Sequence, residues 1–249
     1  MDCFMLDVLE GTSPSLDTWR KIQFIRVRNN CCEVWENGEG HITVVFCTSD
    51  DSHDWLSNAR FLPRLFVHPH VRTPMLVHTG FTTVLQALQP SLDLVLAKIP
   101  IRRLSICGFS MGGALAVLYG YLVTQQRHAR YPVDVLSIAA PVCIGDDRFN
   151  RAVNATAGLS IRNIVFPRDP ITTLIENVVG RPYARNEKIV VYLTSGIPKG
   201  TVSSVLEGYD GGLLADLGRF GSNIWDLHSR SIYIPAIRAH IGVGASCTV

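Results

Sequence analysis

The sequence has no strong excess of charge of either sign. Its 23 Lys and Arg residues nearly balance its 21 Asp and Glu residues, and charged residues make up only 18% of the 249-residue chain. A nucleic-acid-binding surface needs clustered Lys and Arg, so the composition predicts no nucleic-acid partner. The chain also lacks internal repeats, low-complexity segments and a dividing linker, which favours one domain over residues 1–249.

The first twenty residues lack the basic segment and the apolar stretch of a secretory signal peptide, so we expect an intracellular protein. We also expect residues 1–20 to form a loosely ordered N-terminal extension. The cysteine count is odd and no Cys-x-x-Cys pair occurs, which indicates reduced, buried thiols rather than a disulfide framework. The seven cysteines stand at positions 3, 31, 32, 47, 107, 143 and 247. His68 and His70 have no carboxylate or thiol partner nearby, so we expect no metal site.

Apolar strand-like segments alternate with helical segments through the middle of the chain. We expect strands at 22–27, 31–35, 42–47, 103–107, 133–140, 160–166 and 188–194. Helices are expected at 81–99, interrupted or bent near Pro90, and at 114–126, 146–155 and 228–241. Because the central strands are apolar on both faces, this order predicts an α/β fold: a mostly parallel sheet with helices on both faces.

An uncharged run from residue 104 to 123 contains the most informative motif, Gly108-Phe109-Ser110-Met111-Gly112. It fits the pattern Gly-x-Ser-x-Gly and lies between a predicted strand and a predicted helix, as a nucleophile turn requires. The helix N-terminus beside the serine would favour a developing oxyanion. One alternative is a membrane-spanning helix, although glycines cluster within the run. The other is a glycine-rich packing turn with an incidental serine.

A serine nucleophile needs a histidine base, and the base needs an orienting carboxylate. On scaffolds with this motif the acid and then the histidine follow the serine in the sequence. His228 follows the last strand and a long loop and opens a helix, so it is preferred over His128 and His240. Asp169 directly follows a strand in a Pro-Arg-Asp-Pro turn, which would hold its carboxylate at the carboxyl end of the sheet. We interpret the other acids as helix caps, local partners or residues at the wrong edge: Asp134, Asp146, Asp147 and Asp226.

Together these segments resemble the fungal-type triacylglycerol lipases, also called class 3 lipases. The resemblance runs from about residue 42 to 233 and rests on the segments 44–55, 77–81, 106–116, 140–153 and 163–171 and on His228. It implies the α/β-hydrolase fold and a catalytic triad of Ser110, Asp169 and His228. His78, within the second of these segments, precedes the serine, and we interpret it as structural.

The resemblance also implies an oxyanion hole formed in part by the residue after the serine. Met111 would supply a backbone N–H there. The family usually has Phe-Arg-Gly followed by Ser or Thr after its third strand, whereas this chain has Phe46-Cys47-Thr48-Ser49. By register Ser49 takes the second oxyanion role, with Thr48 as the alternative.

The implied substrate is a carboxylic ester of an acyl lipid, hydrolysed without a cofactor, with transient contact to a lipid surface. A mobile lid is expected in residues 59–71, where Phe61, Leu62, Leu65 and Phe66 would face lipid, and the alternative is that these side chains pack on the core. Other substrates left open are phospholipids, lysophospholipids and small esters. A catalytically weak lipid-binding or scaffold protein with the same fold is the alternative from another class.

Overall fold

The computed structural model describes residues 3–11, 18–47, 63–66, 68, 71, 74–127, 130–141, 144–165, 169, 172, 190–192 and 228–240. Within these residues the fold is built on a seven-stranded sheet in the order β1-β2-β3-β6-β7-β8-β9. The strands are β1 (Trp19–Val27), β2 (Asn30–Asn37), β3 (His41–Cys47), β6 (Arg103–Phe109), β7 (Val133–Ile138), β8 (Leu159–Val165) and β9 (Val190–Tyr192). The seven predicted strands correspond to these seven, with shifted ends.

The sheet is mostly parallel. Strands β3, β6, β7, β8 and β9 run in one direction, and β2 and β1 continue the sheet at one edge as an antiparallel pair. Helix α4 (Met111–Arg127) connects β6 to β7, and helix α5 (Asp147–Ala155) connects β7 to β8. Parallel neighbours need such crossover connections, and the carboxyl ends of these strands therefore share one edge of the sheet.

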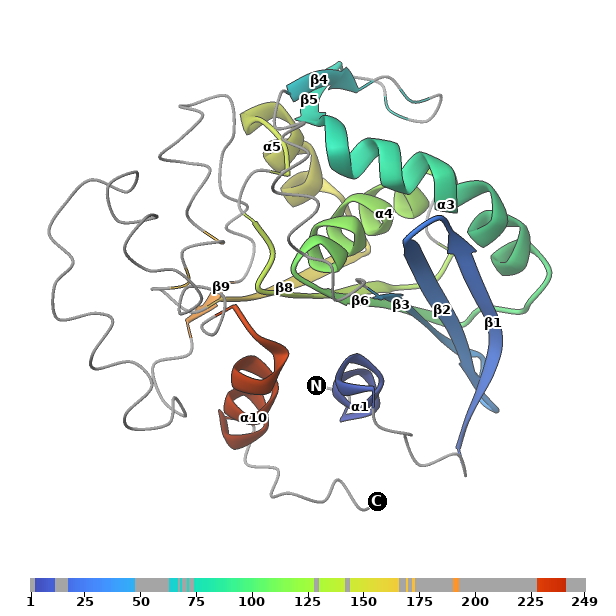
Figure 1. The fold of residues 1–249 in the computed structure, drawn as a ribbon. Helices are drawn as coiled ribbons and strands as arrows, with labels where there is room; N and C mark the ends of the chain where they lie inside the picture. The colour runs from blue at the N-terminus through green and yellow to red at the C-terminus, as the bar shows by residue number, and fades with distance from the viewer. Residues whose placement is uncertain are drawn as a thin grey trace, which may run out of the picture.

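Helices cover both faces of the sheet, as Figure 1 shows. Helices α3 (Thr79–Ala97), α4 and α5 lie on one face, and α1 (Cys3–Glu10) and α10 (Arg230–His240) lie on the other. Because side chains alternate along a strand, β3 contributes Val44 and Phe46 to the first core and Val45 to the second. The predicted α/β architecture is confirmed.

The uncharged run from residue 104 to 123, which suggested a membrane-spanning helix, is explained by the burial of α4. Every residue from Ala114 to Thr124 is buried in the structure, because α4 packs on the sheet between α3 and α5. None of the helices within the described residues has the length and apolar character to cross a membrane. Helix α3 is not interrupted at Pro90, because it runs on as a helix to Ala97 with Pro90 inside it.

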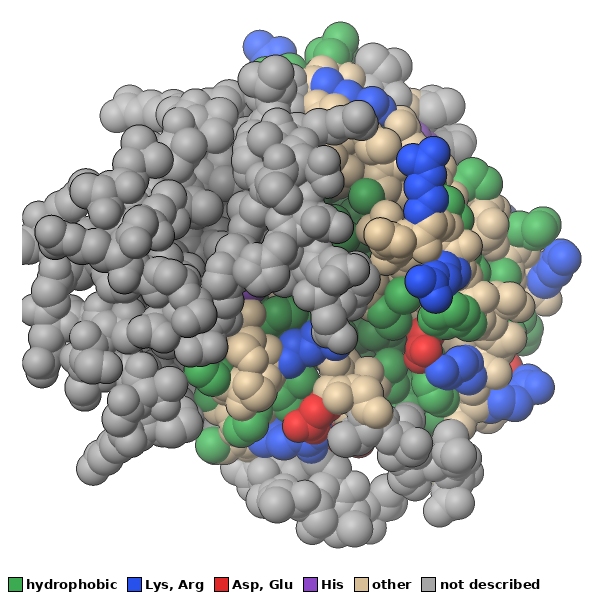
Figure 2. Space-filling model, viewed as in Figure 1, with side chains coloured by type: hydrophobic (Ala, Val, Ile, Leu, Met, Phe, Trp, Pro, Cys, Tyr) green, Lys and Arg blue, Asp and Glu red, His purple; other side chains and the backbone are tan. Residues whose placement is uncertain are grey.

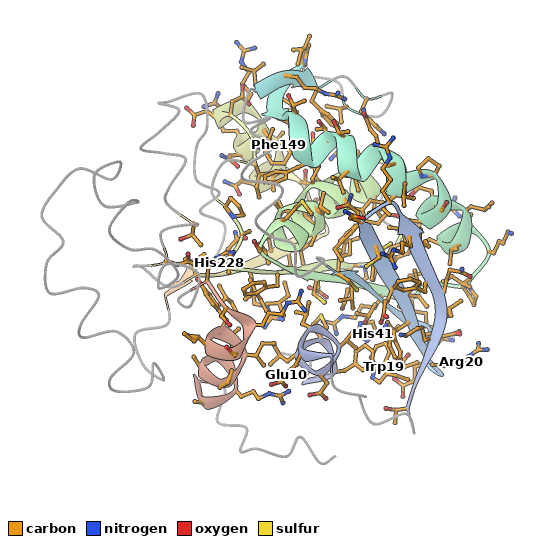
Figure 3. All side chains as sticks on the ribbon, viewed as in Figure 1. Glu10, Trp19, Arg20, His41, Phe149 and His228 are labelled. Carbon is orange, nitrogen blue, oxygen red and sulfur yellow. The ribbon has the colours of Figure 1, made fainter. Side chains whose placement is uncertain are left out.

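Helix α1 was not predicted. Residues 1–20 were expected to be loosely ordered, yet residues 3–10 form a helix whose Phe4 ring stacks on Trp19 at 4.1 Å between centroids. Trp19 in turn contacts the ring of His41 at 5.1 Å (Figure 3). Ion pairs join α1 to α10, because Arg238 contacts both Asp7 and Glu10. This part of the expected extension is therefore packed against the sheet and the last helix.

A two-stranded sheet, also unpredicted, joins β4 (Pro63–Phe66) to β5 (Met75–His78) in antiparallel register. It contains two of the candidate lid residues. Phe66 is buried against the core, whereas Leu65 is 57% exposed. Phe61 and Leu62 lie outside the described residues. Of the two candidate lid residues in the described part of the chain, one therefore packs on the core and the other lies at the surface.

The charged residues are dispersed over the surface, in keeping with the near-neutral composition. In the view of Figure 2, Lys and Arg side chains lie separately over the side formed by α3 and β1, with acidic and apolar side chains between them. On β1 two of the cations are paired, Arg20 with Glu36 and Lys21 with Glu33. Among the described residues of the visible face, this dispersal leaves no continuous basic surface.

Candidate active site

Ser110 forms the whole turn between strand β6 and helix α4. The strand ends at Phe109 and the helix begins at Met111, so the turn is tighter than the predicted one of six residues. Ser110 has a φ of 55°, a left-handed conformation that costs a non-glycine residue about 1–2 kcal/mol. Hydrogen bonds hold it there: its N–H donates to the carbonyl of Ile138 at 2.8 Å, and its carbonyl accepts from the N–H of Gly113 at 2.9 Å.

The two glycines of the motif are required by close backbone contacts. A Cβ on Gly108 would lie 2.2 Å from the carbonyl carbon of Gly112, and a Cβ on Gly112 would lie 2.5 Å from the carbonyl oxygen of Phe46. Real Cβ atoms do not approach backbone so closely. The first turn of α4 can therefore pack against the ends of β6 and β3 only when both positions are glycine.

The side chains of Ser110, His228 and Asp169 form a continuous hydrogen-bonded series. The Ser110 Oγ lies 2.7 Å from Nε2 of His228, and Nδ1 of the same ring lies 2.8 Å from Oδ2 of Asp169. The three residues are at most 6% exposed. With the Nδ1 proton donated to the carboxylate, Nε2 is the acceptor for the serine hydroxyl. The fold thus brings together the three residues that the sequence singled out.

The topology explains how residues so distant in sequence meet. Ser110 follows β6, and Asp169 lies four residues after the end of β8, two strands away in the sheet. His228 lies two residues before the start of α10, the helix on the opposite face of the sheet from α4 (Figure 3). Because β6 and β8 are parallel, their carboxyl ends share one edge, where the imidazole bridges the hydroxyl and the carboxylate.

Tyr233 is a residue of this site that sequence reasoning missed. Its hydroxyl donates a 2.6 Å hydrogen bond to Oδ2 of Asp169, the same oxygen that faces His228. Its ring is fully buried and contacts Phe109 edge-on at 5.7 Å. The available signal was a tyrosine among apolar residues in the helix that follows His228. A buried hydroxyl needs a polar partner, and here the partner is Asp169.

The N-terminal end of helix α10 is fixed by contacts of His228 and Arg230. The ring of His228 lies 5.2 Å from that of Phe109, and the Arg230 guanidinium lies over the same ring at 5.8 Å. Arg230 also donates to the carbonyl of Leu9 in α1 at 3.2 Å. The helix that follows the histidine is thus anchored to both β6 and α1.

The expected oxyanion donors can be placed only in part. Met111 is the first residue of α4, where backbone N–H groups have no acceptor within the helix. Thr48 and Ser49 lie outside the described residues. They follow Cys47, the end of β3, and β3 pairs with β6 through Phe46 and Gly108. Strand β3, which these two residues follow in the sequence, therefore ends beside the nucleophile turn.

His78 has a structural role. It caps the N-terminus of α3, with its Nδ1 accepting from the N–H of Phe81 at 3.3 Å. Burial lowers its pKa from 6.5 to about 4, because the charged imidazolium would lose its hydration. The interpretation of His78 as structural is confirmed, and the cap is the specific role that the sequence did not reveal. Within the described residues, His, Cys, Asp and Glu form no cluster that could hold a metal ion.

Comparison with known proteins decides the family. The model of the family described as Lipase (class 3) matches residues 43–178, more than half of the chain, and this span includes both Ser110 and Asp169. The chain belongs to the class 3 lipase family. It is accordingly a serine ester hydrolase with the α/β-hydrolase fold.

Solved structures agree with this fold. The Rhizomucor miehei triacylglyceride lipase is 21% identical, with a TM-score of 0.61 over 72% of this chain and 68% of that one. A triacylglycerol lipase with a serine protease triad as its catalytic centre is 21% identical, with a TM-score of 0.60 over 73% and 69%. The Penicillium expansum triacylglycerol lipase is 17% identical, with a TM-score of 0.61 over 78% and 76%. No curated protein matched the sequence.

Proposed function

We propose that this class 3 lipase hydrolyses carboxylic esters of acyl lipids through a triad of Ser110, His228 and Asp169. The observation that carries the proposal is the hydrogen-bonded series from hydroxyl to imidazole to carboxylate, with links of 2.7 and 2.8 Å. A serine whose proton can pass to a correctly oriented imidazole is an activated nucleophile. A protein that kept only the fold would have no need of this geometry in a strained turn.

The reaction proceeds in two halves. The Ser110 Oγ attacks the ester carbonyl while its proton passes to Nε2 of His228, and the resulting oxyanion accepts hydrogen bonds from backbone N–H groups, with Met111 as one donor. The imidazolium then protonates the leaving alcohol, and an acyl-enzyme remains. Water, deprotonated by Nε2, attacks the acyl carbonyl, the bond from the acyl carbon to Ser110 Oγ breaks, the imidazolium returns its proton to that oxygen, and the fatty acid is released. Asp169 accepts the hydrogen bond from Nδ1 of His228 and holds the ring in the productive orientation.

Access to the serine requires movement, because Ser110 is 2% exposed. We propose that residues 59–71 act as the lid, opening at a lipid surface, with the exposed Leu65 as one of the apolar side chains that meets it. Membership of the class 3 lipase family and the likeness to solved triacylglycerol lipases support the proposed substrate class. A long-chain acyl ester is the proposed substrate, and Ser49, or alternatively Thr48, is the proposed second oxyanion donor.

The test is release of p-nitrophenol from acetate, octanoate and palmitate esters. We expect wild-type activity to rise with chain length and to vanish in Ser110→Ala. The matched control is Ser105→Ala, which removes a hydroxyl from the same strand, where Ser105 Oγ lies 2.7 Å from Nε2 of His41. This control should retain activity. Folded wild-type protein without activity on any of the three esters would instead support a lipid-binding role. A preference for acetate would point to a small-ester esterase.

A further inference from the structure

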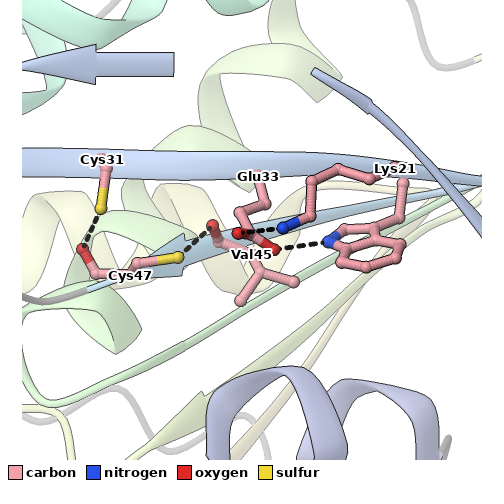
Figure 4. A network of polar contacts seen from close by, with 6 residues as sticks. Lys21, Cys31, Glu33, Val45 and Cys47 are labelled. Atoms are coloured by element: carbon pink, nitrogen blue, oxygen red, sulfur yellow. Dashed lines mark hydrogen bonds and ion pairs between the residues drawn. The ribbon is translucent and has the colours of Figure 1, made fainter. Parts of the chain in front are cut away.

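Two cysteines face each other across strands β2 and β3. Cys31 is the direct partner of Cys47 in the antiparallel register, so both side chains lie on the same face of the sheet. The thiol of Cys31 donates to the carbonyl oxygen of Cys47 at 3.6 Å, and the thiol of Cys47 donates to the carbonyl oxygen of Val45 at 3.7 Å (Figure 4). The proposed ester hydrolysis uses neither thiol.

The register places the two cysteines within bridging distance. Directly opposed residues of an antiparallel pair have Cα atoms about 4.5–5.5 Å apart. Disulfides span Cα separations of about 4.4–6.8 Å, so a bond between Cys31 and Cys47 needs little movement of the backbone. Both residues are also partly exposed, which gives a small oxidant access to them.

The surroundings activate one of the two sulfurs. When Cys31 loses its proton, the thiol of Cys47 can turn to donate to it, and this hydrogen bond is the main cause that lowers the pKa of Cys31 to about 7. The positive charges of Arg26 and Arg230 act in the same direction, against burial and the negative charge of Glu33. A large share of Cys31 is therefore thiolate near neutral pH, and the thiolate is the form that reacts with oxidants.

We propose that Cys31 and Cys47 form a redox modification site, at which a peroxide converts the two thiols into a reversible disulfide. The Cys31 sulfur attacks one oxygen of hydrogen peroxide, the O–O bond breaks, and the departing hydroxide takes up the Cys31 proton as water. The Cys47 sulfur then attacks the sulfenic acid of Cys31, the S–O bond breaks, and a second water leaves with the Cys47 proton. Two thiols lose two electrons, and one peroxide becomes two waters.

The roles of the two sulfurs follow from their surroundings. The pKa of Cys47 is raised chiefly by its hydrogen bond to Cys31, and that cause disappears once Cys31 has become a neutral sulfenic acid. Cys47 is then free to attack as the resolving thiol. The adjacent Cys32 faces the opposite side of the sheet, where burial raises its pKa to about 12. Cys32 is therefore a natural internal control for selectivity.

The test is peroxide treatment of the full chain at pH 7.5, followed by alkylation, digestion and mass spectrometry. A Glu-specific protease is needed because it cuts after the glutamates that separate Cys31 from Cys47 in the sequence. We expect a disulfide-linked peptide pair after treatment, absent after reduction with dithiothreitol. The pair should persist in Cys32→Ala and disappear in Cys31→Ser and Cys47→Ser. Before oxidation, Cys31 should be alkylated at least tenfold faster than Cys32.

Two results would overturn the proposal, and both come from wild-type protein, so they do not depend on the folding of a variant. One is recovery of Cys31 as sulfinic acid, or still alkylatable, with no linked peptide. The other is a peptide in which Cys31 is joined to a cysteine other than Cys47. Because the readout is a covalent bond, neither result bears on whether the lipase hydrolyses esters.

Discussion

The strained backbone of Ser110 should make glycine more stabilising than alanine at this position, the reverse of the usual order. At a φ of 55° the left-handed conformation costs an alanine about 1–2 kcal/mol and costs a glycine almost nothing. The greater freedom of glycine in the unfolded chain offsets about 0.4–1 kcal/mol of this gain. We therefore expect Ser110→Gly to exceed Ser110→Ala in unfolding free energy by about 0.5–1 kcal/mol.

The assay is urea unfolding of both variants, with hydrolysis measured on the same samples. Both should be inactive, and the melting temperature of Ser110→Gly should be higher by about 1–4 °C. The matched control is Ala116→Gly in the middle of α4, a buried helical position that should lose about 1 kcal/mol. The reasoning would fail if the unfolding free energy of Ser110→Gly were about 1 kcal/mol below that of Ser110→Ala, the same loss as in the control, because the turn would then not be strained.

Three further perturbations probe the site and the cap of helix α3. Gly112→Ala would place a Cβ against the carbonyl oxygen of Phe46, so urea unfolding should show a loss of about 1–3 kcal/mol together with lost activity; parent-like behaviour would contradict the packing. Tyr233→Phe removes one donor from Asp169, so unfolding free energy should fall by about 1.5–3 kcal/mol and kcat should fall with KM unchanged. An unaltered kcat would show that this hydroxyl only stabilises the fold. The pKa of His78 is about 4 in the folded protein and about 6.5 in the unfolded chain, so the unfolded chain binds a proton first as the pH falls. The unfolding free energy of the wild type should therefore fall by about 3 kcal/mol from this group between pH 6.5 and pH 4. His78→Asn keeps a capping acceptor without the titration, so its unfolding free energy should fall less over the same range, and equal pH slopes would refute the assignment.

The sequence could predict the features that depend on short, continuous stretches of residues. The apolar strands, the helices between them and the Gly-x-Ser-x-Gly turn each occupy a short stretch, and the structure places all of them near the expected positions. The order of serine, acid and histidine then reduced the candidates to Ser110, Asp169 and His228, which the fold brings into hydrogen-bond contact.

The features that sequence could not predict depend on contacts between distant segments. Helix α1 is marginal as an eight-residue peptide, and it is held by the sheet and by α10, which lies more than 200 residues away in the chain. The Tyr233 hydroxyl has no sequence signal that names Asp169 as its acceptor. Pro90 removes only one hydrogen bond from α3, and the burial of Leu88 and Leu92 on either side holds the helix together.

The most direct test of the account is covalent trapping of the nucleophile with an alkyl phosphonate p-nitrophenyl ester. Such a reagent places a tetrahedral phosphorus where the acyl carbonyl would react, and it transfers only to an activated serine. We expect release of one equivalent of p-nitrophenol, loss of hydrolysis, and the added mass on the peptide that contains Ser110, with no reaction in His228→Ala. Labelling of another residue, or equal labelling without His228, would contradict the central claim that Ser110 is the nucleophile activated by His228.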